Sequence, residues 1–382
     1  MNLLGVRLTL LMGPEPLVGP APPQVLEALS EVEVVQSGWG VSGFRLTFGV
    51  GRASPQDLLD YALVSLPLLQ VNTRVVVIVT FDVTPKVIMD GIVTERHLTP
   101  GEKPGEGKLE LTGRDLSVVL DREEKNAEHP GQDESVIAAK IFANYPAYGL
   151  IPQVTPTFFL EPPFPLDRTP YQECSDWSYL CRLARHHGWV TYIEAGPGPG
   201  INAAYWGPPA ILELQQKSLN VNLPPITNVT SFQAQQDALA PVAVESQVQD
   251  RLLGQTLPVA ALFPLRPPLG AVPDAFVHAG KLRKKKILTS GLSAVQAAAR
   301  AFAEADRGSD DANKLTGTLD SLRYNDVLRA RAPVDVRGAG YTFDGKYLVR
   351  QVTHHIARGS YTQDFTLSRG ETGALAPFVR PG

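Results

Sequence analysis

The chain has little cysteine. Of its 382 residues only two are Cys. Cys174 and Cys181 lie on or beside one expected helix, where a rise of about 1.5 Å per residue separates their Cα atoms by about 10 Å. That separation exceeds the reach of a disulfide. The two thiols are therefore expected to be small buried apolar groups in a chain that needs no oxidising compartment.

The chain also lacks a strong charge of one sign and a long apolar run. A net charge of −4 argues against a protein held on DNA by phosphate contacts. No run approaches the roughly 20 apolar residues of a membrane helix. The N-terminal MNLLGVRLTLLMG alternates in character, is interrupted by Arg7 and follows no basic region. It predicts a strand rather than a signal peptide, so we expect synthesis in the cytoplasm and no membrane insertion of the chain's own.

Familiar catalytic motifs are missing as well. There is no Gly-x-Ser-x-Gly elbow, no His-Glu-x-x-His and no phosphate loop ending in Gly-Lys-Ser/Thr. Adjacent acids are typical of solvated surface; they are Asp133 with Glu134, Asp310 with Asp311, and Glu123 with Glu124. Gly38, Gly40 and Gly43 have the spacing of a dinucleotide-binding loop, but FRLTFGV follows and alternates like a strand, which favours a hairpin. We therefore predict no enzyme, no catalytic residue and no cofactor.

Two pairs of adjacent histidines raise the question of a metal. His186 and His187 belong to an expected helix, where neighbours point about 100° apart and do not chelate as an i, i+4 pair would. His354 and His355 belong to an expected strand, whose successive side chains leave opposite faces. We predict no metal site, and a surface role near a helix C-terminus for the first pair.

The sequence does contain clear secondary-structure signals in the stretch SDWSYLCRLARHHGWVTYIE. Ser175 or Asp176 can cap a helix over 176–187, and Gly188 can end it. A buried stripe is expected on this helix; it comprises Trp177, Leu180, Cys181 and Ala184. The β-branched and aromatic run 189–193 predicts a strand.

Length and turn content set the architecture. A chain of 382 residues exceeds one usual hydrophobic core, and 33 Gly with 33 Pro suit short strands joined by many turns. Residues 1–115 are strand-rich, with one expected helix at 55–66. Residues 116–210 mix strands with helices at 132–145 and 176–187. Residues 211–370 return to strands around a helix at 291–306, and 371–382 form a loose tail.

Two of the predicted helices carry further apolar stripes. That of 132–145 comprises Val136, Ile137, Ile141 and Tyr145, and that of 291–306 comprises Leu292, Val295, Ala299 and Phe302.

An internal similarity links the first and last regions. VTFDV, MDGIVTERHL and KLELTGRD in the first resemble APVDVRG, FDGKYLVRQVTHH and TQDFTLSRG in the last. The matched positions are Asp82 and Val83 with Asp335 and Val336, Asp90 and Gly91 with Asp344 and Gly345, and Leu109 and Leu111 with Phe365 and Leu367. Asp-Gly is a strong hairpin signal. The order of strands predicts two copies of one antiparallel β-barrel flanking an α+β middle domain.

The run KLRKKKIL at 281–288 is open to two interpretations. Its lysines can solubilise a loop or protect an edge strand. Alternatively, they can meet an acidic partner surface or nucleic acid passing nearby.

At this point the residues resemble a known family, the baseplate hubs of contractile tails, which includes phage late control protein D and the N-terminal part of VgrG spike proteins. That family has a Gly-x-Asp turn after its first barrel, a Ser-Asp-Trp helix closed by Gly, and a final Asp-Gly hairpin. The matching positions are Gly113, Asp115, Ser175, Asp176, Trp177, Leu180, Arg182, Leu183, Ala184, Gly188, Asp344 and Gly345. The Pro-rich stretch 152–170 and the segment 211–280 depart from the family pattern.

The resemblance implies a structural role without catalysis. Each hub chain supplies two tube-like barrels, and three chains close into a ring with pseudo-sixfold symmetry between the inner tube protein ring and a three-fold spike. Expected partners are two further copies, the tube, a separate spike protein, other baseplate components, and a tape measure or cargo in the channel. The alternatives are another tube-initiator or adaptor ring of the same particle, and a wall-degrading baseplate enzyme.

Overall fold

The chain's computed structural model describes residues 2–3, 6–51, 63–101, 106–157, 169–249, 254–277, 279–287 and 292–375. The helix predicted at 55–66 falls mainly on 52–62, outside the described residues. None of the described helices is both long and apolar enough to cross a membrane.

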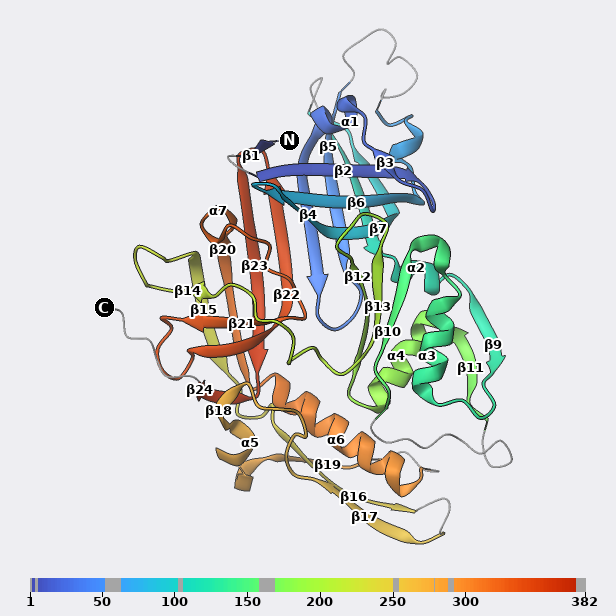
Figure 1. The fold of residues 1–382 in the computed structure, drawn as a ribbon, viewed down its shortest axis with the longest axis vertical. Helices are drawn as coiled ribbons and strands as arrows, with labels where there is room; N and C mark the ends of the chain where they lie inside the picture. The colour runs from blue at the N-terminus through green and yellow to red at the C-terminus, as the bar shows by residue number, and fades with distance from the viewer. Residues whose placement is uncertain are drawn as a thin grey trace.

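Strands dominate the fold, and the longest helices lie in two places, α3 and α4 side by side and α6 apart from them (Figure 1). The strands are β1 (Asn2–Leu3), β2 (Val6–Pro14), β3 (Gly19–Pro20), β4 (Leu29–Ser37), β5 (Gly43–Val50), β6 (Thr73–Phe81), β7 (Thr84–Thr99), β8 (Gly107–Asp115), β9 (Glu124–Glu128), β10 (Leu150–Val154), β11 (Tyr171–Ser175), β12 (Val190–Ala195), β13 (Asn202–Gly207), β14 (Leu219–Asn220), β15 (Val229–Gln236), β16 (Val242–Gln249), β17 (Thr256–Ala261), β18 (Gly270–Pro273), β19 (Arg283–Lys285), β20 (Asn313–Asp320), β21 (Pro333–Arg337), β22 (Gly345–Ala357), β23 (Ser360–Arg369) and β24 (Glu371–Ala374). The helices are α1 (Pro23–Ala28), α2 (Ser117–Leu120), α3 (Glu134–Ala143), α4 (Asp176–His186), α5 (Asp274–Val277), α6 (Ala294–Asp310) and α7 (Ser321–Tyr324), with 3-10 turns η2 (Pro67–Leu69), η3 (Pro146–Tyr148) and η4 (Ala279–Lys281).

One large sheet of 14 strands runs through both ends of the chain, in the order β1-β2-β6-β7-β8-β5-β4-β22-β23-β20-β15 with β3, β14 and β21 attached at its sides. Among the strand pairs of this sheet that the structure describes, β14 with β21 is parallel and the others are antiparallel. The prediction of a mainly β protein, built on antiparallel sheets around a helix-containing middle part, is confirmed.

Each end of this sheet wraps its own apolar core. We call strands β1–β8 the N-terminal β module; its core includes Leu46, Phe48, Leu109 and Leu111. We call β14, β15 and β20–β23 the C-terminal β module; its core includes Leu315, Tyr347 and Leu367. Burial of one face by alternating apolar residues holds each module together.

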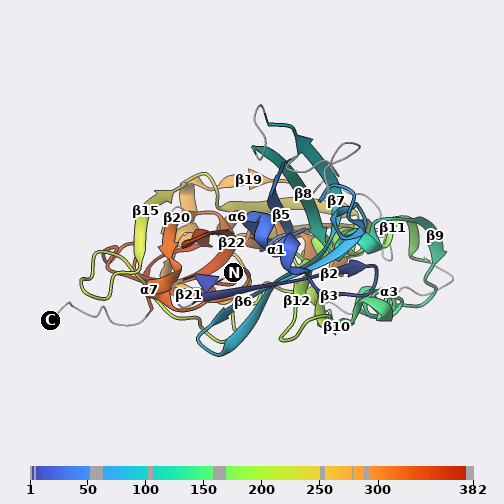
Figure 2. The ribbon, with the colours of Figure 1, turned by 90° about the horizontal axis from the view of Figure 1, so that it is seen from above.

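Residues 116–207 form the middle unit, with a core of their own. α3 and α4 pack with β12 and β13 around Trp177, Leu180, Trp189 and Trp206. α4 begins and ends as the sequence predicts, since Ser175 caps it and Gly188 follows with φ +67°. Figures 1 and 2 place the middle unit and the C-terminal β module on opposite sides of the molecule.

A second helical region, the inserted unit of residues 237–312, interrupts the C-terminal β module between β15 and β20. α6 packs on the small sheet β17-β16-β19 through its alanines Ala297, Ala301 and Ala305. The sequence predicted a shorter helix with Val295 on its buried stripe, but Val295 is 41% exposed. Val136, assigned to the buried stripe of 132–145, is likewise 54% exposed.

The basic run contributes the edge strand β19. β19 pairs in parallel with β16 and is exposed. Lys284 forms an ion pair with Glu245 at 2.8 Å, and Lys285 pairs with Glu304. An edge strand protected by lysines, the first of the two interpretations, matches this position.

The two β modules repeat one strand order. In the N-terminal module the order is β6-β7-β8-β5-β4, and in the C-terminal module it is β21-β22-β23-β20-β15, with every neighbouring pair antiparallel. β4 and β5 are joined by the short glycine-rich turn 38–42, as the sequence predicts. β15 and β20, by contrast, are separated by the inserted unit.

Irregularities of pairing recur at matching places. Between β7 and β8 the register shifts at Thr94, and between β22 and β23 it shifts at Arg350. Between β4 and β5 it shifts at Ser30, and between β15 and β20 at Thr230. Since bulges have positional meaning, these four fix which residues correspond.

The hydroxyls at one pair of bulges also make the same bond. Ser30 Oγ donates to the carbonyl oxygen of Thr47 at 2.8 Å, and Thr230 Oγ1 donates to that of Thr318 at 3.1 Å. A shared hydrogen bond at corresponding bulges supports a duplication rather than a chance likeness of strand order.

The individual positions matched from sequence are wrong by a small shift. Asp90 and Gly91 lie inside β7, whereas Gly345 begins β22 with φ +119°. The hairpin of the first copy is at Asp82, in the left-handed conformation with φ +51°; hence Asp82 and Val83 do not match Asp335 and Val336, which lie within β21.

On the return strands the shift is two residues. Because Thr112 and Thr366 both follow the bulge, Leu111 corresponds to Phe365 rather than to Leu367, and Leu109 has no match in Phe365. The apolar alternation has period two, so a slip of two residues keeps the same pattern and sequence could not detect it.

Residues 371–374, predicted as part of a loose tail, form β24 and pair with β18. Glu371 and Gly373 are buried there. Residues 376–382 lie outside the described residues.

Candidate assembly surface

The uncovered face of the large sheet is polar across both modules. Its side chains alternate with the core residues, and cross-strand pairing aligns them in rows that cross the boundary between the modules. One row is Gln233, Thr316, Thr366, Gln351 and Ser37; the next is Ser231, Thr318, Asp364, Thr353 and Val35; a third is Thr362, His355, Glu33, Arg45, Thr112 and Glu95. We call this surface the polar sheet face.

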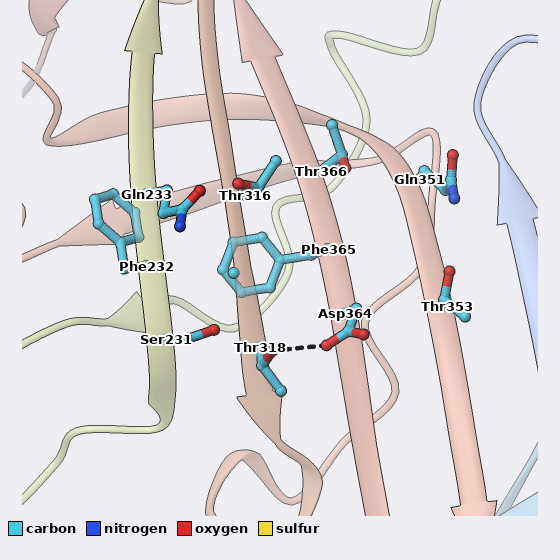
Figure 3. A pocket seen from close by; sticks show the side chains of 11 residues that line it. Ser231, Phe232, Gln233, Thr316, Thr318, Gln351, Thr353, Asp364, Phe365 and Thr366 are labelled. Carbon is cyan, nitrogen blue, oxygen red and sulfur yellow. Dashed lines mark hydrogen bonds between the residues drawn. The ribbon is translucent and has the colours of Figure 1, made fainter.

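Figure 3 shows the half of the polar sheet face on the C-terminal module, where mostly polar side chains, together with Phe232 and Phe365, line an open groove of about 390 Å³. Thr318 donates a hydrogen bond to Asp364 at 2.7 Å. His355 lies 3.2 Å from the same aspartate and 3.9 Å from Glu33 of β4. This groove is open and lined mainly by polar side chains, which suits an extended contact or a channel wall better than an enclosed apolar small-molecule pocket.

The two modules meet where β22 pairs with β4. Antiparallel pairs run from Gln351 opposite Ser37 to Ala357 opposite Glu31. Gln36 ties the junction from the side, since its Nε2 donates to the Ile88 carbonyl at 2.9 Å and its Oε1 accepts from the Ala330 N–H at 3.3 Å. The junction is thus a continuous piece of sheet.

Arg331 links the junction to the middle unit. Its Nε donates to the Ser37 carbonyl at 2.9 Å and an Nη donates to Ser42 Oγ at 3.0 Å. Its guanidinium lies 4.0 Å above the ring of Tyr192 in β12. Arg331 has φ +75°, a backbone conformation that non-glycine residues rarely adopt. One side chain therefore contacts all three parts.

The Gly-x-Asp motif lies directly beside this contact. Asp115 Oδ2 accepts from the backbone N–H of Ser42 at 2.6 Å and Oδ1 from that of Ser117 at 3.0 Å. Burial raises the pKa of Asp115 above its usual value, although these hydrogen bonds and the nearby Arg331 oppose the rise. Gly113 is required because a Cβ there would lie 2.2 Å from the ring of Phe44.

The Ser-Asp-Trp motif organises the middle unit. Ser175 Oγ accepts from the Ser178 N–H at 3.2 Å as the N-cap of α4. Asp176 is buried and accepts from Lys125 at 2.6 Å, Tyr145 at 2.7 Å and Gln172 at 2.8 Å. Burial and the Asp176 carboxylate raise the pKa of Tyr145 to about 12. The carboxylate therefore acts as an acceptor that fixes three neighbours.

The remaining motif positions on α4 have structural contacts. The buried ones, all in the middle-unit core, are Trp177, Leu180, Leu183 and Ala184. Arg182 stacks its guanidinium 4.9 Å above Tyr179 and donates to the Tyr171 carbonyl at 3.3 Å. A Cβ at Gly188 would lie 2.8 Å from the Cα of Ala303, so this glycine lets α6 approach. The two cysteines are free and half-buried rather than buried.

Asp344 and Gly345 shape the start of β22. Asp344 Oδ1 accepts from the Ala339 N–H at 2.7 Å, and its carbonyl accepts from Arg369 at 3.0 Å. Of the twelve motif positions, the structure brings Gly113 and Asp115 to the three-way junction, while the α4 residues and Asp344–Gly345 occupy separate places.

The two pairs of adjacent histidines are arranged differently: one pair lies on opposite faces of a strand, and the other pair shares one partner. His354 is buried and its Nδ1 lies 3.0 Å from the Tyr361 hydroxyl, while His355 is on the opposite, polar face, as predicted. His186 and His187, expected to diverge, converge on one carboxylate, Glu134, at 3.0 Å and 2.8 Å.

The partner of this histidine pair, Glu134, begins α3. Burial opposes its ionisation, but hydrogen bonds from both rings prevail and lower its pKa to about 2. Within the described ranges no group of three or more His, Cys, Asp or Glu side chains could hold a metal ion.

A buried charge cluster fastens the inserted unit to the C-terminal module. Arg350 of β22 lies 3.2 Å from Asp310 of α6 and 4.2 Å from the ring of Trp39. Arg266 also pairs with Asp310. Glu371 lines a cavity together with Arg266, Asp310 and Arg350, and it is only 8% exposed. Burial, together with the nearby carboxylates of Asp310 and Asp274, raises the pKa of Glu371 to about 7.

This pKa predicts a pH-dependent stability. A carboxyl with a pKa of about 7 in the folded protein and an ordinary pKa of 4.5 holds its proton more tightly when folded, so the free energy of unfolding should fall as pH rises from about 4.5 to about 7. Glu371→Gln removes this titration. In urea unfolding across this pH range, we expect the unfolding free energy of the wild type to fall relative to that of the variant as the pH rises. Parallel profiles would contradict the assignment.

The sequence does not reveal the side-chain contacts of Arg331 and Gln36, which join segments far apart in the chain. Nor does it reveal the buried ion pair of Arg74 in β6 with Asp90 in the neighbouring strand β7, at 2.7 Å. Arg331 contacts residues nearly 300 positions away, at 37 and 42. The only local signal was a charged residue within an otherwise apolar strand, as Arg74 is in β6.

Comparison with known proteins defines the fold. No family model matches the sequence, and no curated protein matches it. Solved structures do match. The chain is similar to a tail protein from Neisseria meningitidis MC58, with 13% identity, a TM-score of 0.62 and 96% of each chain covered. It is similar to the 43 kDa tail protein of prophage MuSo2 from Shewanella oneidensis, with 12% identity, a TM-score of 0.63, and 95% of this chain and 98% of that chain covered.

A third similar structure is a component of a secretion system. The E. coli c3393 protein, a component of the type VI secretion system with structural similarity to the T4 tail proteins gp27 and gp5, matches with 15% identity and a TM-score of 0.51, covering 96% of this chain and 80% of that chain. The chain therefore has the fold of phage tail proteins and of this secretion component. The resemblance to contractile-tail hubs is confirmed at the level of the fold.

Proposed function

We propose that the chain is a structural baseplate hub of a contractile phage tail or a related injection system. Three copies form a ring that joins the hexameric inner tube to a separate trimeric spike. The observation that carries the proposal is the repeated module: β6-β7-β8-β5-β4 and β21-β22-β23-β20-β15 are joined edge to edge through β4 and β22. Three chains of this kind present six similar modules.

The geometry favours a ring with the polar sheet face inward. The opposite face of the sheet is covered by the two module cores, so the polar face is the uncovered wall. Rings close when head-to-tail contacts between different patches repeat with one rotation. The rims would contact the tube and spike over large surfaces, beside other baseplate components, and a tape measure or cargo would pass along the polar wall.

The proposal includes no catalysis. A wall-degrading role would require release of fragments from peptidoglycan by the purified protein, and such release would overturn this part of the proposal. Another adaptor ring of the same particle needs only one module for each sixfold position, so the duplication favours the hub.

The ring predicts a measurable stoichiometry. In light scattering or native mass spectrometry the purified protein, alone or with its tube protein, is expected at three times the 41.4 kDa of one chain. Electron microscopy of the ring should show six similar densities around a channel. A protein that remains monomeric under all these conditions, or rings of six chains, would exclude the proposed hub.

A further inference from the structure

The junction inside one chain uses one edge from each module, and over the described residues each module also has a corresponding edge that pairs with no strand. In the C-terminal module, β21 pairs with the first part of β22, up to Leu348, and β4 pairs with the later part, from Gln351. In the N-terminal module, β6 pairs with the first part of β7, up to Ile92. Over the described residues, no strand pairs with that side of β7 beyond Ile92.

The other free edge belongs to β15. β15 corresponds to β4 by strand order and by the matching bulge, but over the described residues it pairs only with β20. Six of its eight residues are exposed, and a long strand with one free edge usually carries some protection against pairing with another chain. In the part of the chain that the structure describes, one β4-like edge and one β22-like edge therefore have no partner strand.

We propose that β15 of one copy pairs with the later part of β7 in the next copy, in the register that β4 and β22 use within the chain. The inference rests on the proposed ring and names its contact. The occupant of both edges is a second copy of this chain, because the complementary edge is the one that the repeat itself supplies.

The bulges give the register. Residues of β22 correspond to residues of β7 numbered 256 lower, and residues of β15 to residues of β4 numbered 200 lower. The internal pairs Val352–Gln36, Thr353–Val35, His354–Val34 and His355–Glu33 then become Arg96–Gln236, His97–Gln235, Leu98–Ala234 and Thr99–Gln233 between copies.

The ends of the new ladder have physical reasons. Beyond Gln236 the chain turns away, since the Asp237 carboxylate accepts from the Leu239 N–H at 2.9 Å. At the other end Pro100, which falls opposite Phe232, has no N–H and removes at most one hydrogen bond; proline is tolerated at such edges. Glutamines at Gln233, Gln235 and Gln236 leave β15 uncharged and so do not repel the incoming strand.

Cysteine pairs test the register. His97→Cys with Gln235→Cys places two thiols at the position that Thr353 and Val35 occupy inside the chain. Under mild oxidation we expect covalent species of two and three chains and none larger. Thr353→Cys with Val35→Cys is the matched control and should close within one chain without a rise in mass. His97→Cys with Gln236→Cys, whose second thiol faces the opposite side of the strand, should give at most traces.

Hydrogen exchange tests the same contact without substitution. In the ring, the amides of 231–236 and 94–99 that do not already pair with β20 or β8 should exchange at least about tenfold more slowly than in the diluted monomer. A ring that forms while both edges exchange freely, or that cross-links only in the shifted pair, would overturn this contact and leave the proposed hub intact. Absence of any three-chain ring would instead overturn the hub.

Discussion

Replacing Arg74 by Ala should destabilise the protein by about 3–5 kcal/mol, because it leaves a buried carboxylate without its partner. Arg74 and Asp90 form two parallel hydrogen bonds at 2.8 Å and 2.7 Å, and both residues are 3% exposed. Arg74 also donates to the Pro16 carbonyl at 2.6 Å, and Asn202 of the middle unit donates to Asp90 at 2.9 Å. The substitution should therefore loosen the middle unit as well.

The matched control is Arg122→Ala. Arg122 pairs with Glu15 at 2.5 Å, but its side chain is 40% exposed, and exposed ion pairs contribute less than about 1 kcal/mol. Urea unfolding followed by tryptophan fluorescence measures both variants. Equal losses for Arg74→Ala and Arg122→Ala would show that burial does not distinguish the two pairs.

Replacing Trp177 by Ala should lower the free energy of unfolding by about 3–5 kcal/mol, because the substitution leaves a cavity in the core. Trp177 is 6% exposed in the middle-unit core beside Leu180 and Leu183. Trp39→Ala is the control: Trp39 is 39% exposed and lies over Arg350, so only about 1 kcal/mol is expected. Thermal unfolding or urea titration gives both values, and unchanged stability of Trp177→Ala would contradict its burial.

Local patterns in the sequence predicted local structure well. The cap at Ser175 and the glycine at Gly188 bound α4 because both act through neighbouring backbone groups. The alternation of apolar residues predicted the repeated strands, since one buried face imposes period two. Patterns of this kind report which face is buried, and they were sufficient for the order of strands.

Local sequence patterns gave wrong predictions where contacts with other elements determine the conformation. Asp90-Gly91 has the sequence of a hairpin turn, yet Arg74 and Asn202 hold Asp90 inside β7. His186 and His187 converge because Glu134, from another helix, lies between them. The inserted unit went unrecognised because its short strands β16, β17 and β19 gain their order from packing on α6.

The inserted unit has one consequence for the whole assembly. It interrupts only the second copy of the repeat, after β15, whereas the first copy has a five-residue turn at the same place. Around a ring of three chains, alternate modules would therefore carry an extra α6-covered lobe. The inner wall would repeat every sixty degrees, while the rim that carries the lobes would repeat every hundred and twenty degrees. That rim would therefore offer three equivalent binding positions.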